Sequence, residues 1–309
     1  MKPILKYRNF ANNNNYYMMK KLLITSFLVS ILFYACSPSI EDLHKSGDKK
    51  YQLNDFNGAI LDYTKAIEID SAYSKSFYMR GLCKQALMDN DSAFLDFNKA
   101  IAIDSTKYNY YLKRGRIRVS VRQLKLAIKD FNKSIELEPE SSNSYVERGA
   151  VKNSLGDKRG ALLDFEKAIS LNPKNANAYF ERGLLYLEYV DYKNIMRVVK
   201  KNNGNNYYIY SNENIYYNIS GAFVNFSKAI EIAPSDPKLY FYSGLLKSKV
   251  IRYKFYSTLP RHLNKEFEEV WDSQLLDVSY FDLNGSIVDY SIAIELDSKN
   301  SNYYYSLFS

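Results

Sequence analysis

The chain has 309 residues and a formal net charge of +8, and its length alone would suggest two globular domains. A basic chain suggests a nucleic-acid partner, but residues 1–36 hold five Lys or Arg and no acid, so that 37 basic and 34 acidic residues follow them. This nearly balanced charge argues against nucleic-acid binding, and two cysteines, Cys36 and Cys83, exclude a framework of disulfides.

The N-terminus has the organisation of an export signal. A Met-Met-Lys-Lys tetrad at 18–21 precedes an apolar run at 22–34, and Cys36 follows shortly after it. This segment resembles the signal peptide of a bacterial lipoprotein, in which Cys36 would carry the lipid, although Phe33 and Tyr34 depart from the usual lipobox. The alternative is an uncleaved signal anchor, for which this apolar run is short compared with the ~20 residues that span a bilayer.

The lipoprotein resemblance implies a protein anchored in the bacterial cell envelope, at the outer membrane or facing the periplasm. Residues 1–35 would be a start extension and signal peptide, and residues 36–39 would be the tether. Ser39, with Asp42 three residues later, predicts the N-cap of a helix. Because the tether spans only about 10–14 Å when extended, we expect the first helices close to the membrane surface.

Four five-residue phrases recur at a spacing of 34 residues: FYMRG, YLKRG, YVERG and YFERG, which end at Gly81, Gly115, Gly149 and Gly183. Each phrase is followed by a small, an aromatic and a second small residue, as in Ala161, Phe165 and Ala168. This spacing and these motifs resemble the tetratricopeptide repeat. The resemblance implies an all-α fold, a right-handed α-solenoid of about six helix–turn–helix repeats.

The repeat boundaries follow from the spacing. We expect a solenoid over 40–309, with repeats at 40–73, 74–107, 108–141, 142–175, 176–236 and 237–300 and a partial seventh at 301–309. Insertions near 190–220 and 251–284 lengthen the fifth and sixth repeats, in the turn between their two helices. The partial seventh repeat, with Tyr304, either covers the sixth or leaves an apolar edge for a partner or for self-association.

Two kinds of contact are predicted within this framework. Gly81, Gly115 and Gly149 are expected to let the first helix of a repeat approach the second at Ala93, Ala127 and Ala161. Arginines and aspartates at the same period are expected to pair between successive repeats, as Asp62–Arg80, Asp96–Arg114, Asp130–Arg148 and Asp164–Arg182. Pairing within a repeat fits worse, because Ser46 would face Asp62 and Arg182 would face Asn225. The alternative to both is unpaired, solvated charge.

The two insertions differ in composition. The first is rich in Asn and Tyr, contains Lys200 and Lys201, and is expected to form a flexible loop or a β-hairpin that turns near Gly204. The second contains Trp271, the one tryptophan, among apolar residues at helical spacing over 265–276. Trp271 is either a recognition residue or, as is commoner for a Trp in an amphipathic helix, a packing residue.

The sequence contains no catalytic constellation. The two histidines, His44 and His262, lie in unlike surroundings, and no cluster of His, Cys and carboxylate residues has the spacing of metal ligands. The glycines follow the repeat period and form no phosphate-binding loop. We therefore expect no enzyme activity, no cofactor and no metal.

The tetratricopeptide resemblance implies that the first helices line a concave groove that binds a protein or peptide. Its lining would comprise Tyr78, Leu82, Asn109, Leu112, Arg116, Asn143, Val146, Ala150, Asn177, Phe180, Leu184, Phe241 and Leu245. The three asparagines recur near the starts of these helices and would either bind the backbone of a partner or cap the helices.

These features favour a non-enzymatic scaffold, tethered to an envelope membrane, that binds a protein partner through the groove, through the inserted edge, or through both. The alternative is capture of a glycan or peptide in an aromatic pocket that the insertions build around Trp271. A continuous groove would favour the scaffold, and a closed aromatic platform on the inserted edge would favour ligand capture.

Overall fold

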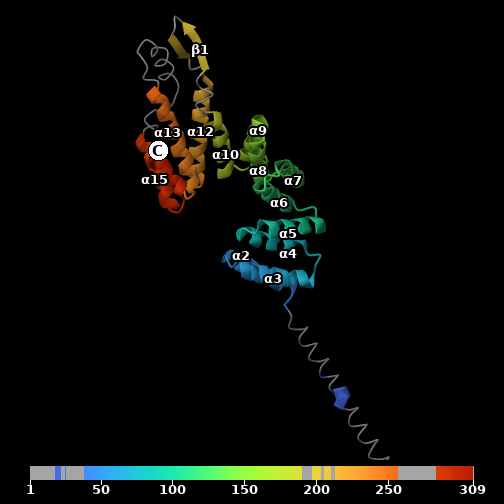
Figure 1. Cartoon of the computed structure of the whole chain (residues 1–309). Helices are drawn as coiled ribbons and strands as arrows, with labels where there is room; N and C mark the ends of the chain where they lie inside the picture. Colours follow the sequence, from blue (N-terminus) through green and yellow to red (C-terminus); the bar gives the residue numbers. More distant parts are fainter. Residues whose placement is uncertain are drawn as a thin grey trace, which may run out of the picture. The chain divides into compact units, whose positions relative to one another are not determined.

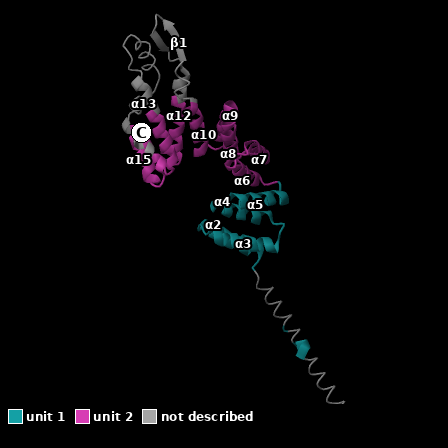
Figure 2. Cartoon of the chain, viewed as in Figure 1, with its two compact units in different colours: residues 1–105 teal, residues 106–309 magenta. Residues whose placement is uncertain are grey.

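The computed structural model describes residues 18–21, 25, 38–189, 197–202, 205–209, 213–256 and 283–308. The chain divides into two compact units, residues 1–105 and residues 106–309, which Figure 2 shows in different colours. Within the described residues, none of the helices has the length and apolar content needed to cross a membrane.

The first unit contains two helix pairs (Figure 1). α2 (Ile40–Gln52) packs against α3 (Phe56–Ile69), and α4 (Ser74–Ala86) packs against α5 (Asn90–Ile103). α3 also contacts α4, so that the second helix of one pair packs on the first helix of the next.

The second unit continues the same order of paired helices. Its pairs are α6 (Tyr108–Ser120) with α7 (Leu124–Leu137), α8 (Ser142–Ser154) with α9 (Lys158–Leu171), α10 (Ala176–Tyr189) with α12 (Glu213–Ile232), and α13 (Pro237–Tyr256) with α15 (Leu283–Leu296). A further helix, α16 (Ser301–Phe308), contacts α15. Successive pairs meet where α7 contacts α8, α9 contacts α10 and α12 contacts α13. The predicted fold class of stacked helix pairs is therefore confirmed.

The first insertion adds a β-hairpin between α10 and α12. β1 (Arg197–Asn202) pairs antiparallel with β2 (Asn205–Ile209), and Asn202 lies opposite Asn205. Of the two forms expected for this insertion, the hairpin is the one observed. α12 begins at Glu213, before the expected end of the insertion at 220, and α13 continues to Tyr256. Residues 257–282, which include Trp271 and His262, lie outside the described residues.

Short polar side chains fix where several helices begin. Ser39 and Asp42 form the predicted cap of α2: Ser39 Oγ accepts a hydrogen bond from the Asp42 backbone N–H at 3.1 Å, and the Asp42 carboxylate accepts one from the Ser39 N–H at 3.2 Å. The Ser39 hydroxyl and N–H together hold the pKa of Asp42 below its ordinary value. Asp55, Asp89 and Asp157 cap second helices by accepting from a backbone N–H three residues further on.

The core of each repeat is an aromatic ring of the second helix that lies against a glycine of the first. The rings are almost fully buried, between 0% and 3% exposed. The pairs are Gly47 with Tyr63, Gly81 with Phe97, Gly115 with Phe131, Gly149 with Phe165, Gly183 with Phe226 and Gly244 with Tyr290. A Cβ added at Gly149 would lie 2.6 Å from Cε1 of Phe165, which is closer than real Cβ contacts come. The glycines are therefore required by the close approach of the two helices.

The sequence-based expectation for these glycines was only partly right. A close helix–helix approach is present, but the nearest side-chain atoms to Gly81, Gly115 and Gly149 belong to phenylalanines and not to Ala93, Ala127 and Ala161. The alanines are themselves fully buried. The phenylalanine lies one helical turn further along, and its larger ring reaches the first helix.

We expect Gly149→Ala to destabilise the protein by roughly 1–3 kcal/mol, because the new methyl group meets the Phe165 ring in a packed core. This cost exceeds the gain of about 1 kcal/mol that alanine brings to a helix interior. Chemical unfolding followed by circular dichroism measures the change. Phe165→Leu in the same chain makes room for the methyl group, so the double variant should lose less than the sum of the two single variants; simple additivity would contradict the contact.

Candidate functional site: the first-helix face

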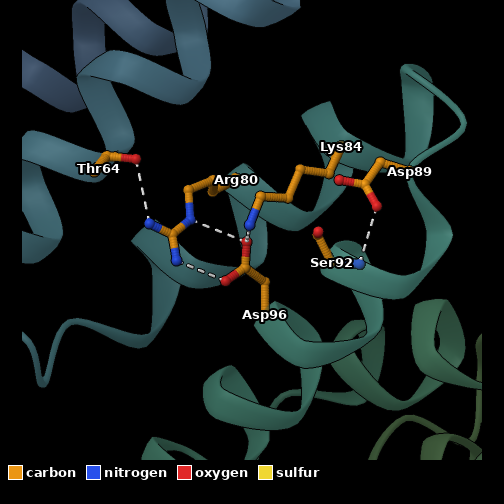
Figure 3. A network of polar contacts seen from close by, with 6 residues as sticks. All are labelled: Thr64, Arg80, Lys84, Asp89, Ser92 and Asp96. Carbon is orange, nitrogen blue, oxygen red and sulfur yellow. Dashed lines mark hydrogen bonds and ion pairs between the residues drawn. The ribbon is translucent and has the colours of Figure 1, made fainter.

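The second, third and fourth repeats each carry a buried carboxylate between two cations. In the second repeat, Asp96 accepts hydrogen bonds from Arg80 Nε at 3.0 Å and Arg80 Nη2 at 2.7 Å, and from Lys84 Nζ at 2.7 Å. Figure 3 shows Arg80 and Lys84 converging on this carboxylate. Arg80 Nη1 also donates to Thr64 Oγ1 of the preceding repeat at 3.2 Å. A bidentate guanidinium and an ammonium together compensate for the burial of the aspartate.

The same arrangement recurs with variations. Asp130 pairs with Arg114 and Arg118, Asp164 pairs with Arg148 and Lys152, and Asp289 pairs with Lys247. In the first repeat Asp62 accepts from Ser46 and Lys50, both at 2.7 Å, and in the fifth Arg182 Nε donates to Asn225 Oδ1 at 2.9 Å. Burial acts to raise the pKa of Asp62, but the hydrogen bonds from Lys50 and Ser46 outweigh it and lower that pKa.

The predicted pairing between successive repeats is wrong. Asp62–Arg80, Asp96–Arg114, Asp130–Arg148 and Asp164–Arg182 are not the observed pairs; each arginine binds the acidic or amide residue of its own repeat. Ser46 with Asp62 and Arg182 with Asn225, which made pairing within a repeat look worse, are both observed contacts. A serine hydroxyl can donate to a carboxylate, and an asparagine side-chain oxygen can accept from an arginine. The second cation, one helical turn after the arginine, was not recognised, although Lys50, Lys84, Arg118 and Lys152 share the repeat period.

The residues expected to line a groove have different exposures. Leu112, Val146 and Phe180 are buried, at 6%, 6% and 1% exposed, and belong to the core. The half-buried members are Tyr78 and Leu82 in the first unit and Asn109, Arg116, Ala150, Leu184, Phe241 and Leu245 in the second, while Asn143 and Asn177 are exposed. We refer to the accessible side of α6, α8, α10 and α13 as the first-helix face.

The asparagines of this face are not all equivalent. The N-caps of α6 and α8 are Lys107 and Ser141, so the capping role considered for Asn109 and Asn143 is wrong. Asn143 Oδ1 instead accepts from Asn175 Nδ2 at 3.1 Å. Asn175 also donates to Ser142 Oγ at 2.8 Å, which links the first residue of α8 to the residue before α10.

A row of charges crosses the first-helix face of the second unit. Lys113 on α6, Glu147 on α8 and Glu181 on α10 occupy the same repeat position, two residues before the glycine. Arg116 Nε donates to Glu147 Oε1 at 2.8 Å. Glu188, two turns after Glu181, accepts from Asn153 Nδ2 at 3.0 Å and lies 3.2 Å from Lys158 Nζ. The 34-residue spacing of positions 113, 147 and 181 is the feature of the sequence from which this row could have been predicted.

Two charges of the row, Glu181 and Lys113, are partly removed from water. Burial raises the pKa of Glu181, Glu147 and Glu188 raise it further, and Lys238 opposes this shift. Lys238 Nζ itself lies 3.9 Å from the centre of the Phe180 ring, a cation–π contact. Burial and Arg116 lower the pKa of Lys113. Half-buried charges of this kind favour a partner that supplies opposite charge or hydrogen bonds.

The described residues offer binding chemistry and no grouping that suggests a metal. Within them, no cluster of three or more His, Cys, Asp or Glu side chains is placed to hold a metal ion. Cys83 is fully buried, and burial raises the pKa of its thiol to about 11, so it remains protonated. The predicted lipidation residue, Cys36, lies outside the described residues, and Lys200 and Lys201 fall on β1.

Comparison with known proteins identifies the repeat. Residues 108–141 match a family model described as tetratricopeptide repeat, and residues 151–188 match one described as TPR repeat. A search of curated protein sequences found no match. Among solved structures, the APC/C hetero-tetramer Cut9–Hcn1 is similar with a TM-score of 0.63 at 13% identity, over 91% of this chain and 45% of that chain.

Two other similar solved structures cover less of this chain. A thermophilic TPR protein of Thermus thermophilus is similar with a TM-score of 0.50 at 16% identity, over 69% of this chain and all of that chain. MamA matches with a TM-score of 0.46 at 23% identity, over 62% of this chain and 96% of that chain. The likeness to the Cut9–Hcn1 and Thermus thermophilus structures shows the fold, a stack of helix pairs.

Pairing within the repeat predicts a specific energetic coupling. In a double-mutant cycle, Arg148→Met and Asp164→Asn should couple by roughly 0.5–3 kcal/mol, because the two side chains share two hydrogen bonds. The matched control is Arg148→Met with Asp130→Asn, the pair that a link between repeats would require, and its coupling should be close to zero. Urea unfolding measures both cycles. A larger coupling of Arg148 to Asp130 than to Asp164 would contradict pairing within the repeat and support pairing between successive repeats.

Proposed function

We propose that this tetratricopeptide-repeat protein is a non-enzymatic scaffold, held at a bacterial envelope membrane, that binds a protein or peptide partner through its first-helix face. The observation that carries the proposal is Glu181. Its carboxylate is half-buried, and within the described part of the chain no hydrogen bond or ion pair satisfies it. A carboxylate in this condition is stabilised when a partner supplies a donor or a positive charge.

The surroundings of Glu181 suit an extended polypeptide. Leu184 and Leu245 are half-buried and pack against the core cluster of the fifth and sixth repeats, so they offer apolar contact beside the charges. Arg116 with Glu147 and Lys158 with Glu188 are partly exposed pairs that contribute polar contacts and partner orientation more than affinity. Surfaces that bind proteins or peptides combine apolar and polar side chains, and this arrangement indicates no particular chemical reaction.

The membrane tether in this proposal comes from the sequence and from the position of α2. Cys36 follows a signal-like segment, and the helix that begins at Ile40 is already capped at Ser39. Only Ser37 and Pro38 separate the lipid site from the cap, so the first repeat would lie within about 10–14 Å of chain from the membrane. Localisation in the bacterial envelope, at the outer membrane or facing the periplasm, follows from this tether.

Ligand capture around Trp271 stays the alternative function, because residues 257–282, which include Trp271, lie outside the described residues. The scaffold is favoured because Glu181 and the half-buried Leu184 lie on a described helix of the first-helix face. The hairpin of the first insertion remains a second surface for the same partner.

A photo-crosslinking amino acid in place of Leu184 should give a discrete adduct with the partner in intact cells, because Leu184 lies on the first-helix face. The same group in place of Leu163, which is 58% exposed on the second helix α9, serves as the matched control and should give no adduct of that size. Glu181→Lys should reduce the adduct at position 184 by about tenfold or more, as expected for the loss of about 1.4 kcal/mol of binding free energy.

Removal of residues 191–211, between α10 and α12, distinguishes binding at the first-helix face from binding at the hairpin. An adduct that persists at position 184 after this deletion assigns the partner to the first-helix face. An adduct that disappears with the deletion but survives Glu181→Lys would contradict the proposed site and assign the partner to the hairpin.

Lipidation gives a separate prediction. Metabolic labelling with a radioactive fatty acid should label the protein, and Cys36→Ser should abolish the label and release the protein from the membrane fraction. Because the chain has two cysteines, Cys83→Ser is the matched control and should remain labelled and membrane-bound. Label that survives Cys36→Ser would exclude the lipoprotein assignment.

A further inference from the structure

His44 is buried where the first helix pair meets the second. This side chain of α2 is 4% exposed, and its Nε2 lies 2.8 Å from Ser76 Oγ on α4. Its ring packs at an angle against Tyr63 on α3, with 5.2 Å between ring centroids, and edge-on against Tyr73, with 4.9 Å. One imidazole therefore joins elements of two successive repeats.

The position of His44 is apolar or aromatic in the other repeats. Three residues before the repeat glycine, these carry Tyr78, Leu112, Val146, Phe180 and Phe241. None of those side chains changes its charge near neutral pH. Only in the first repeat is this packing position held by a group that becomes a cation in mild acid.

The hydrogen bonds around His44 fit a neutral ring. Nδ1 is buried and has no partner within the described residues. Neutral imidazole carries one N–H, and the Ser76 hydroxyl satisfies Nε2 in either tautomer because it can donate or accept. Imidazolium carries N–H groups on both nitrogens, so protonation would place a charged donor at Nδ1 with no acceptor in reach.

Charged groups on both neighbouring first helices act on the ring. Burial lowers the pKa of His44, Lys75 on α4 lowers it further, and Asp48 and Glu41 on α2 oppose the shift. Asp48 is already engaged, because it accepts a hydrogen bond of 2.6 Å from the Tyr63 hydroxyl. The Tyr63 hydroxyl on α3 is neutral, because burial raises its pKa. The packed state thus holds His44 uncharged.

We propose that His44 is an acid-sensitive switch, and that protonation of its imidazole releases α2 from α4 and opens the first repeat. A histidine whose pKa is lower in the folded than in the unfolded state stabilises the fold fully above the unfolded value of about 6.5. This stabilisation is lost as the pH falls below that value toward the folded pKa. The opening requires neither the partner nor the tether, so it is independent of the proposed function.

Hydrogen–deuterium exchange of the full chain at pH 7.5 and pH 5.5 tests the switch. After correction for the intrinsic effect of pH, exchange in peptides from α2 should rise at pH 5.5 by up to about tenfold. This is the largest change in the opening equilibrium that one histidine can cause at one pH unit below its unfolded pKa. Peptides from α8, in the fourth repeat, serve as the internal reference and should not change. His44→Gln keeps a donor for Ser76 and cannot titrate in this range, so its α2 exchange should be the same at both pH values.

The histidine NMR signals of the unmodified chain give a second readout that does not depend on a variant. There are two histidines, so His262→Gln assigns the signal of His44. A pKa below 6.5 for His44, together with acid-dependent exchange in α2 that His44→Gln abolishes, supports the switch. A pKa at or above 6.5, unchanged exchange in the unmodified chain, or the same acid response in His44→Gln would overturn it.

Discussion

The contact between a glycine of the first helix and an aromatic ring of the second is the constraint on which each repeat depends. The ring fills the space that a Cβ would occupy, and an added methyl at Gly115 would lie 2.5 Å from Phe131 Cε1. The two helices of a pair are thereby held at a short separation, and this also fixes the positions of the arginine before the glycine and of the aspartate before the aromatic residue. Every repeat described in this chain, including those lengthened by insertions, keeps a glycine–aromatic pair.

The buried aspartate lies next to that ring in the sequence and is held at the same helix–helix contact. Asp96, Asp130 and Asp164 are 2–4% exposed, so each needs positive charge within hydrogen-bond distance. An arginine and a second cation one turn later supply it. Because the arginine also reaches the preceding repeat, as Arg148 does at Asn132 Oδ1, the same side chain joins the two helices of a repeat and the repeat to its neighbour.

The first helices therefore have two sides with different chemistry. One side packs against the second helices through glycine, aromatic and aliphatic residues. The other carries the charge row of Lys113, Glu147 and Glu181, whose partial burial makes it suited to a partner. At the N-terminal repeat the packing side itself contains a titratable group, His44, so the acid-sensitive switch that we propose lies in the repeat next to the expected tether.

The sequence by itself determined the repeat period, the helix pairs, the Ser39 cap and the hairpin alternative, because these depend on residues close together in the chain. It could not determine which aspartate each arginine binds. In a periodic sequence every residue has a copy one repeat away, so pairing within a repeat and pairing between repeats produce the same pattern. The three-dimensional contact at Arg148 and Asp164 decided this, as it decided that Leu112, Val146 and Phe180 are core residues. The turns after the first four first helices show the same limit: Asn54, Met88, Arg122 and Gly156 all have positive φ, yet only one of them is the glycine that marks such a turn in a sequence.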